Sequence, residues 1–255
     1  MEEPIHFYNQ RGEKLAGSLH RPEQHDGCGV VFGHCFTCTR HTRIIREMCD
    51  ALAAEKVMAL RFDFSGNGQS EGEFAKSTYS KQISEMKEAA DVIFGKGVRR
   101  LGLAGHSMGA VIAVLAAGQI KTVEAVCALA GRLTGLNARN FFSPRQIKEL
   151  EDTGKVAFTS RGRALQLSAD FFADAKQYDL VETVKSFKKP LMVVHGDADE
   201  IIPIKNAYLA KALNPEHMEL AVISGADHMF SNEEHRSQIV KQVVKWFKEH
   251  LHESF

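Results

Sequence analysis

Ser107 is the residue whose surroundings most clearly indicate chemistry. It stands at the centre of Gly105-His106-Ser107-Met108-Gly109, which matches the pattern G-x-S-x-G. Apolar runs on both sides predict a sharp turn from a strand into a helix, which lifts the serine above a sheet. The glycines permit this strained turn, and the N–H groups of the helix N-terminus point at charge that develops beside the serine. We therefore predict that Ser107 is a nucleophile; the alternative is a glycine-rich turn with an idle serine.

A serine nucleophile needs a base, and the base needs a carboxylate that orients it. With this kind of turn the three follow in the order Ser, Asp or Glu, His. His228 lies between the last expected strand and the last expected helix, so we predict it as the base. Asp199 is the predicted acid because it lies at the turn of the preceding strand's loop, where Asp197 and Glu200 compete with it. Asp197 suits a hydrogen bond to the loop backbone, and we interpret His195 as a structural anchor.

An oxyanion that forms during acyl transfer needs two backbone N–H groups. We expect one from Met108, the residue after the nucleophile, and one from the loop that follows the expected strand 29–33. Phe36 is the candidate donor in that loop, and Cys35 is the alternative. His106 is expected to point away from the reacting groups.

Two other motifs could indicate different chemistry. His34, Cys35, Cys38 and His41 have the residue types of a zinc site, but they crowd into the loop that the oxyanion site needs. We interpret both cysteines as idle thiols, neither metal ligands nor a redox pair. Residues 66–68 read G-x-G but lack the third glycine and the following helix of a dinucleotide site, so we predict a turn that supports the oxyanion side.

The elements that must position these residues alternate between strands and helices. The expected strands are 5–9, 14–21, 29–33, 57–62, 100–105, 123–129, 190–195 and 218–223. The expected helices that alternate with these strands are 42–56, 79–94, 107–119, 204–213 and 233–251. The first two strands read as an antiparallel hairpin. This alternation predicts a mostly parallel, eight-stranded α/β sheet with helices on both faces, and the loops at one edge would bring the candidate residues together.

Residues 131–187 interrupt this alternation, and a structureless loop of that length would be unusual. Helical patterns at 145–153 and 164–176 predict a small helical cap above the sheet edge, within a single domain that spans 1–255. The candidate substrate contacts in the cap are Phe141, Phe142, Phe158, Phe171, Phe172 and Tyr178. We interpret its arginines as a solvated face, with an acidic substrate as the alternative; they are Arg132, Arg139, Arg161 and Arg163.

Composition argues against several classes of protein. The 255 residues carry 32 Lys and Arg against 32 Asp and Glu, and this balance is unlike the basic domains that bind nucleic acid or anionic membranes. The longest apolar stretch, 108–118, is about half the roughly 20 residues that a membrane span needs. Five cysteines without an apolar leader segment predict reduced thiols and a cytoplasmic protein.

Taken together, the motifs resemble the α/β-hydrolase family over nearly the whole chain. The segments that carry the resemblance, in the family's order, are FDFSGNGQS, GHSMG, HGDADEIIP and GADHMF. More narrowly, two segments are similar to small cinnamoyl/feruloyl-type carboxylesterases and to the hydrolase part of proteins that fuse this fold to an OsmC-like domain; they are GHCFTCTRHT and RFDFSGNGQSEGEF. We do not expect an OsmC-like domain in this chain. The resemblance implies the α/β-hydrolase fold and oxyanion donors at Phe36 and Met108. The family's usual His-Gly is His34-Cys35 in this chain.

These observations predict a serine carboxylesterase that needs no cofactor and no metal. Ser107 would attack the ester carbonyl, and His228 would then activate water to hydrolyse the acyl-enzyme. The expected partner is a small-molecule ester with a small to medium, partly apolar acyl group, with no nucleic acid and no membrane; a homodimer stays open. The alternatives are a thioesterase, amidase or peptidase with the same triad, a catalytically silent ligand-binding module, or a metal or redox protein that uses Cys35 and Cys38.

Overall fold

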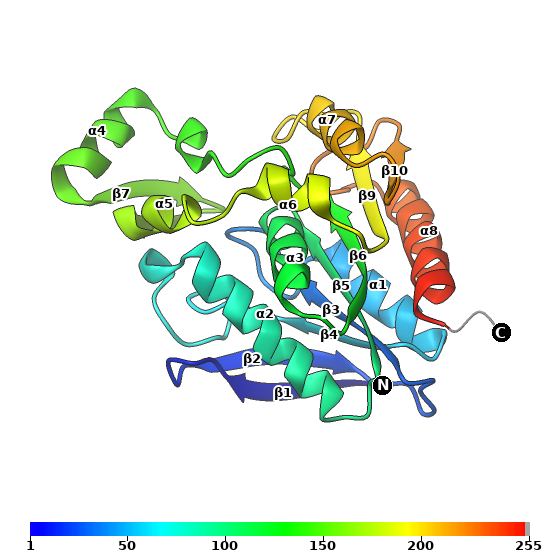
Figure 1. Ribbon diagram of the computed structural model, residues 1–255. Coiled ribbons are helices and arrows are strands. Elements are labelled where there is room, and N and C mark those ends of the chain that lie inside the picture. The colour runs from blue at the N-terminus through cyan, green and yellow to red at the C-terminus, as the bar shows by residue number, and fades with distance from the viewer. Residues whose placement is uncertain (253–255) are drawn as a thin grey trace.

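One sheet of eight strands lies at the centre of the molecule (Figure 1). A computed structural model describes residues 1–252. The strands, in their order across the sheet, are β1 (Glu2–Tyr8), β2 (Lys14–His20), β4 (Met58–Phe62), β3 (Cys28–Gly33), β5 (Arg100–His106), β6 (Val123–Leu129), β9 (Leu191–Gly196) and β10 (Met218–Ile223). β2 pairs antiparallel with β1 and β4, and all other neighbours are parallel. The predicted mostly parallel sheet with an N-terminal antiparallel hairpin is confirmed.

Helices cover both faces of the sheet, also as predicted (Figure 1). α1 (Arg43–Ala54) and α8 (Glu233–Leu251) pack on one face. α2 (Tyr79–Phe94), α3 (Met108–Gln119) and α7 (Lys205–Leu213) pack on the other. Each face therefore has its own cluster of buried apolar side chains, and β3, β4 and β9 are buried along their full length. This explains their continuous apolar sequences, since a strand covered on both sides has no solvent-facing position.

Residues 131–187 lie between β6 and β9, and we call them the insertion. Its elements are the 3-10 turn η2 (Ala138–Phe141), α4 (Pro144–Thr153), β7 (Lys155–Ser160), β8 (Arg163–Ser168), α5 (Ala169–Ala175) and α6 (Leu180–Ser186). The expected helix 145–153 is confirmed, but the expected helix 164–176 is wrong in its first part, where β8 pairs with β7. Arg161 and Gly162 both have positive φ, which is the geometry of a tight hairpin turn, and this turn outweighs the weak helical pattern.

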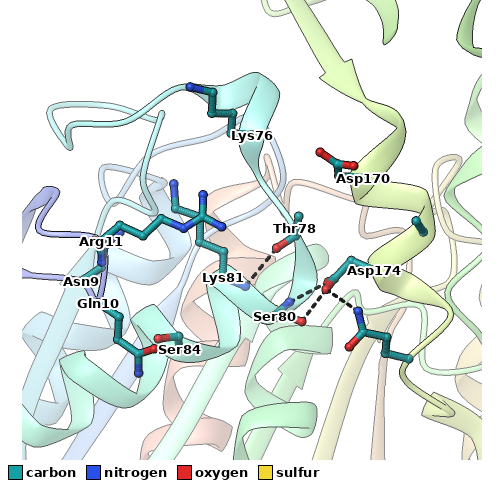
Figure 2. Close-up of a pocket in the computed structure, with 12 residues that line it drawn as sticks. Asn9, Gln10, Arg11, Lys76, Thr78, Ser80, Lys81, Ser84, Asp170 and Asp174 are labelled. Atoms are coloured by element: carbon teal, nitrogen blue, oxygen red, sulfur yellow. Dashed lines mark hydrogen bonds between the residues drawn. The ribbon is translucent and has the colours of Figure 1, made fainter. Parts of the chain in front are cut away.

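Asp174 in α5 fastens the insertion to α2 (Figure 2). Its carboxylate accepts hydrogen bonds from the Ser80 N–H at 2.8 Å and the Ser80 hydroxyl at 2.5 Å. The same hydroxyl hydrogen-bonds the Tyr178 hydroxyl at 2.7 Å. Because Ser80 lies in the first turn of α2, the carboxylate also faces the positive end of that helix. The polar pocket at this junction is lined by none of the predicted site residues.

Two of the five cysteines form a disulfide, so the prediction of reduced thiols is wrong for Cys35 and Cys38. The tight loop between them places their Cα atoms 5.2 Å apart, within the usual range for a disulfide. Cys28, Cys49 and Cys127 are free and buried, and burial raises the pKa of each thiol, that of Cys28 to about 12. The cysteines therefore no longer support a cytoplasmic location. No helix within residues 1–252 is both long and apolar enough to cross a membrane.

Helix α3 approaches the sheet at a distance that only glycine permits. A Cβ added to Gly105 would lie 2.2 Å from the carbonyl carbon and oxygen of Gly109. A Cβ added to Gly109 would lie 2.2 Å from the carbonyl oxygen of Gly33. Since these obstacles are backbone atoms, a side chain at either position would push the helix away from the strands.

We expect Gly105→Ala to lower the free energy of unfolding by about 2 kcal/mol or more, because the methyl group would overlap rigid backbone. Gly118→Ala is the matched control: Gly118 is exposed near the end of the same helix with nothing within 4 Å of an added Cβ. This control should raise the free energy of unfolding by about 0.5–1 kcal/mol. Denaturant titration measures both, and equal effects would contradict the close-packing argument.

We also expect Cys35 and Cys38 to resist alkylation in denaturant without reductant, because their sulfurs are bonded to each other. The three free cysteines should be alkylated as soon as unfolding exposes them. Peptide mapping by mass spectrometry makes the measurement, with a fully reduced sample as the control in which all five are labelled. Alkylation of Cys35 or Cys38 in the unreduced sample would show that the disulfide is absent.

Candidate active site

Ser107 adopts a left-handed backbone, with φ 56° and ψ −113°, between β5 and α3. Such a conformation costs a non-glycine residue roughly 1–3 kcal/mol, so its surroundings must hold it. The Ser107 N–H donates to the carbonyl of Leu129 at 2.8 Å, and its own carbonyl accepts from the Ala110 N–H at 3.2 Å. These bonds connect the turn to the neighbouring strand and to the first turn of α3. The predicted strand–turn–helix around the serine is therefore present.

His228 connects Ser107 to Asp199 through hydrogen bonds. Its Nε2 lies 3.0 Å from the Ser107 hydroxyl oxygen, and its Nδ1 lies 2.8 Å from Asp199 Oδ2. The three residues follow β5, β9 and β10, whose carboxyl ends meet at one edge of the sheet. Asp197 instead accepts a hydrogen bond from the Gly225 N–H at 2.6 Å, as the sequence suggested. The structure thus brings the three predicted residues together and separates the competing carboxylate from them.

The Asp199 carboxylate is held ionised by its hydrogen bonds. Oδ1 accepts from the N–H groups of Ile201 at 2.9 Å and Ile202 at 2.7 Å. Burial by itself would raise the pKa of Asp199, but hydrogen bonds from His195, His228 and Ile202 lower it well below its usual range. An ionised Asp199 accepts a hydrogen bond from the Nδ1–H of His228, which keeps the proton on Nδ1 and leaves Nε2 free to accept a hydrogen bond from the serine hydroxyl. His195 also hydrogen-bonds the Ile202 carbonyl at 2.7 Å, so it anchors this loop.

His106 supports the loop that carries His228. It is fully buried, and its Nε2 hydrogen-bonds the carbonyl of His228 at 2.7 Å. Burial, together with the charge of His228, lowers the pKa of His106 to about 3, so the ring is neutral and donates this bond. The side chain does not line the pocket that contains Ser107, but its ring centre lies 5.0 Å from that of His228, so the prediction that it points away from the reacting groups is wrong. Its contact with residue 228 was missed, because nothing in the sequence relates two positions so far apart.

The N–H groups of Phe36 and Met108 have no acceptor among residues 1–252, and both residues line the same pocket as Ser107. The side chain of His34 orients the first of these groups. Its Nδ1–H donates to the Cys35 carbonyl at 2.7 Å, while its Nε2 accepts from the Phe64 N–H at 3.0 Å. The Cys35 carbonyl and the Phe36 N–H belong to one planar peptide, so fixing the carbonyl also fixes the direction of the N–H.

A buried ion pair supports this loop from the neighbouring strand. Arg40 pairs with Asp63, and the Arg40 N–H donates to the same carboxylate at 2.6 Å. The Gln69 N–H donates to its other oxygen at 3.0 Å. The loop after β4 therefore contacts the loop that carries Phe36, and its support of an oxyanion site stays a prediction. The zinc interpretation does not fit, since both nitrogens of His34 are engaged and the two cysteine sulfurs are bonded to each other.

A pocket of about 680 Å³ opens beside Ser107, below the insertion. Most of its wall is apolar, and its side chains include Phe36, Tyr79, Val111, Leu136, Phe141, Phe142, Phe158, Leu167 and Phe171. Four of the six aromatic residues predicted as substrate contacts lie in this wall. Phe172 and Tyr178 do not: Phe172 packs on Phe142, with 5.8 Å between ring centroids, and Tyr178 bonds Ser80.

The tip of the β7–β8 hairpin connects the two sides of the pocket mouth. Ser160 hydrogen-bonds Thr37, next to Phe36 in the loop after β3, at 2.8 Å between hydroxyl oxygens. The adjacent Arg161 places its guanidinium 3.1 Å from the sulfur of Met229, next to His228. The hairpin that the sequence did not predict therefore helps to enclose the site.

Comparison with known proteins places this geometry in a family. The family model described as prolyl oligopeptidase family matches residues 76–254. A monoacylglycerol lipase of Mycolicibacterium smegmatis is 22% identical, with 96% of each chain covered. Est1E of Butyrivibrio proteoclasticus with bound ferulic acid superposes with a TM-score of 0.82 at 23% identity, covering 96% of this chain and 98% of the other. The esterase domain of a Rhodothermus marinus protein superposes with a TM-score of 0.76 at 22% identity, covering 99% and 100%. The chain belongs to the prolyl oligopeptidase family and is a hydrolase with the α/β-hydrolase fold.

Proposed function

We propose that this protein hydrolyses carboxylic esters through an acyl-enzyme on Ser107. The observation that carries the proposal is the hydrogen-bonded series from Ser107 through His228 to Asp199. Ser107 attacks the ester carbonyl while His228 accepts its proton, and Asp199 stabilises the resulting imidazolium. His228 then protonates the leaving alcohol, and water hydrolyses the acyl-enzyme with His228 as the base.

The developing oxyanion is stabilised by the N–H groups of Phe36 and Met108. Neither group has an acceptor among residues 1–252, and each lies in the wall beside the serine. Donors that are oriented before the reaction need no reorganisation when charge develops, which is why such sites are effective. In this proposal 1–255 is a single domain, and the insertion at 131–187 is a cap that covers the acyl group.

Two observations support an ester with a small to medium, partly apolar acyl group. The pocket has mostly apolar walls and a volume of about 680 Å³, which is in the range of small-molecule sites. A relative that aligns with nearly the whole chain is named as a monoacylglycerol lipase.

A peptidase is the second candidate, because the matched family is named for an oligopeptidase. The same three residues would cleave an amide, so the serine and histidine do not distinguish the two. Comparing an ester with the corresponding p-nitroanilide of the same acyl group does, and faster cleavage of the anilide would favour the peptidase.

We expect Ser107→Ala to lower kcat for p-nitrophenyl esters, acetate through octanoate, by about 10⁴-fold or more, because the nucleophile is removed. The matched control is Ser84→Ala, on the outer part of α2, where the hydroxyl hydrogen-bonds Glu88 at 3.2 Å. It should retain full activity. Initial rates by absorbance measure both variants. Activity that survives Ser107→Ala would contradict the assignment of the nucleophile, and a folded wild type inactive on every ester would contradict ester hydrolysis.

We expect His34→Phe to lower kcat by about 10- to 100-fold with little change in KM, because the Cys35 carbonyl loses its shorter hydrogen bond and keeps only the one from the Cys38 N–H at 3.1 Å, so the direction of the Phe36 N–H is held less firmly. His34→Asn keeps an N–H close to the position of Nδ1 and should retain more of kcat. Steady-state kinetics on one ester, with thermal unfolding of both variants, separates this effect from stability. Equal kcat in the two variants at equal stability would rule out the orienting role of His34.

A further inference from the structure

Two arginines, Arg132 and Arg161, line the pocket beside Ser107. Arg132 follows β6, at the start of the insertion, and Arg161 lies at the turn between β7 and β8. None of the described residues that line this pocket is an Asp or a Glu. The wall is otherwise apolar or neutral, so the two positive charges meet no opposite charge from the pocket itself.

Arg132 differs from the other arginines that the fold encloses. It is half-buried, and its guanidinium lies 6.0 Å from the ring centre of Phe141, yet it makes no hydrogen bond or ion pair with any residue in 1–252. The buried arginines each have a carboxylate, in the pairs Arg40–Asp63, Arg61–Glu2 and Arg236–Glu47. A charge that is taken partly out of water costs free energy unless an opposite charge compensates it.

Arg132 also follows a residue whose backbone packs close to the backbone of Ser107. A Cβ added to the preceding Gly131 would lie 2.8 Å from the Cβ of Ala110 and 3.6 Å from the Ser107 carbonyl oxygen. The backbone at 131 therefore packs directly on the first turn of α3. Arg161 is different, because it is exposed and its guanidinium contacts the Met229 sulfur. Of the two arginines, Arg132 is therefore the one whose positive charge a negative group on an enclosed substrate would compensate.

We propose that Arg132 binds a carboxylate of the substrate, so that the enzyme prefers esters that carry a free carboxylate on an otherwise apolar body. This inference rests on the proposed function, since it names the substrate of the same site. The planar guanidinium can donate two parallel hydrogen bonds to a carboxylate. Apolar walls strengthen that contact because they keep water away from it. The carboxylate belongs either to the acyl part or to the alcohol part of the ester.

Matched pairs of esters test the preference and locate the charge. For the acyl part, monoesters of 4-nitrophenol with adipic and suberic acids are compared with their methyl-capped neutral counterparts. For the alcohol part, the octanoyl ester of 4-hydroxybenzoic acid is compared with that of 4-hydroxybenzamide. We expect the anionic member of at least one pair to have the higher kcat/KM, and Arg132→Gln to reduce that advantage by about tenfold.

The control is Arg139→Gln, because Arg139 is exposed, pairs with Glu151 at 2.9 Å and does not line the pocket. It should leave the preference unchanged. Equal kcat/KM for the two members of every pair overturns the proposal, as does a preference that persists in Arg132→Gln. A preference that is lost in Arg161→Gln but kept in Arg132→Gln also overturns it.

A binding measurement separates this inference from the proposed function. Ser107→Ala is titrated calorimetrically with monomethyl suberate and with dimethyl suberate, neither of which it should hydrolyse. We expect tighter binding of the anionic compound, and loss of the difference when Arg132→Gln is added. That result supports anion recognition even if no ester is turned over, whereas equal binding of the two compounds contradicts it even in an active esterase.

Discussion

The left-handed backbone at Ser107 depends on the contact between α3 and the end of the sheet. Gly105 and Gly109 let the helix approach β3 and β5 until backbone atoms touch, and no side chain could occupy that space. The N–H of Ser107 is then within reach of the Leu129 carbonyl, which offsets part of the backbone strain. Ser107, which we propose as the nucleophile, is therefore placed together with the Met108 N–H and the first turn of α3 by one feature of packing.

The remaining groups of the site are held by polar contacts whose partners lie on neighbouring loops. Asp199 is stabilised as a carboxylate by its own loop, and it determines which nitrogen of His228 carries the proton. His34 performs a similar role for the peptide that carries the Phe36 N–H. In both cases a buried group is fully engaged by its surroundings, so the reactive atom beside it has a single orientation. Such preorganisation makes hydrogen bonds useful to a reaction.

Much of this could be predicted from local patterns. Continuous apolar runs indicate strands covered on both faces, and their alternation with helices places the three loops at one edge of the sheet. What was missed involves short elements and contacts between distant residues. The β7–β8 hairpin is set by a turn at Arg161 and Gly162 that competes with a weak helical pattern. The bond between Asp174 and Ser80 joins positions whose relation depends on how the insertion folds back.

The sequence by itself determined the order of the elements, the strand–turn–helix around Ser107 and the loops from which Asp199 and His228 come. These follow from residue types within a few positions of each other, because backbone preference and apolar periodicity are local properties. Only the tertiary structure decided that His106 hydrogen-bonds the loop that carries His228, that His34 orients an N–H group, and that Arg132 lies half-buried with no carboxylate partner among residues 1–252. Each of these depends on which side chains meet across the fold, and that is set by packing rather than by neighbouring sequence.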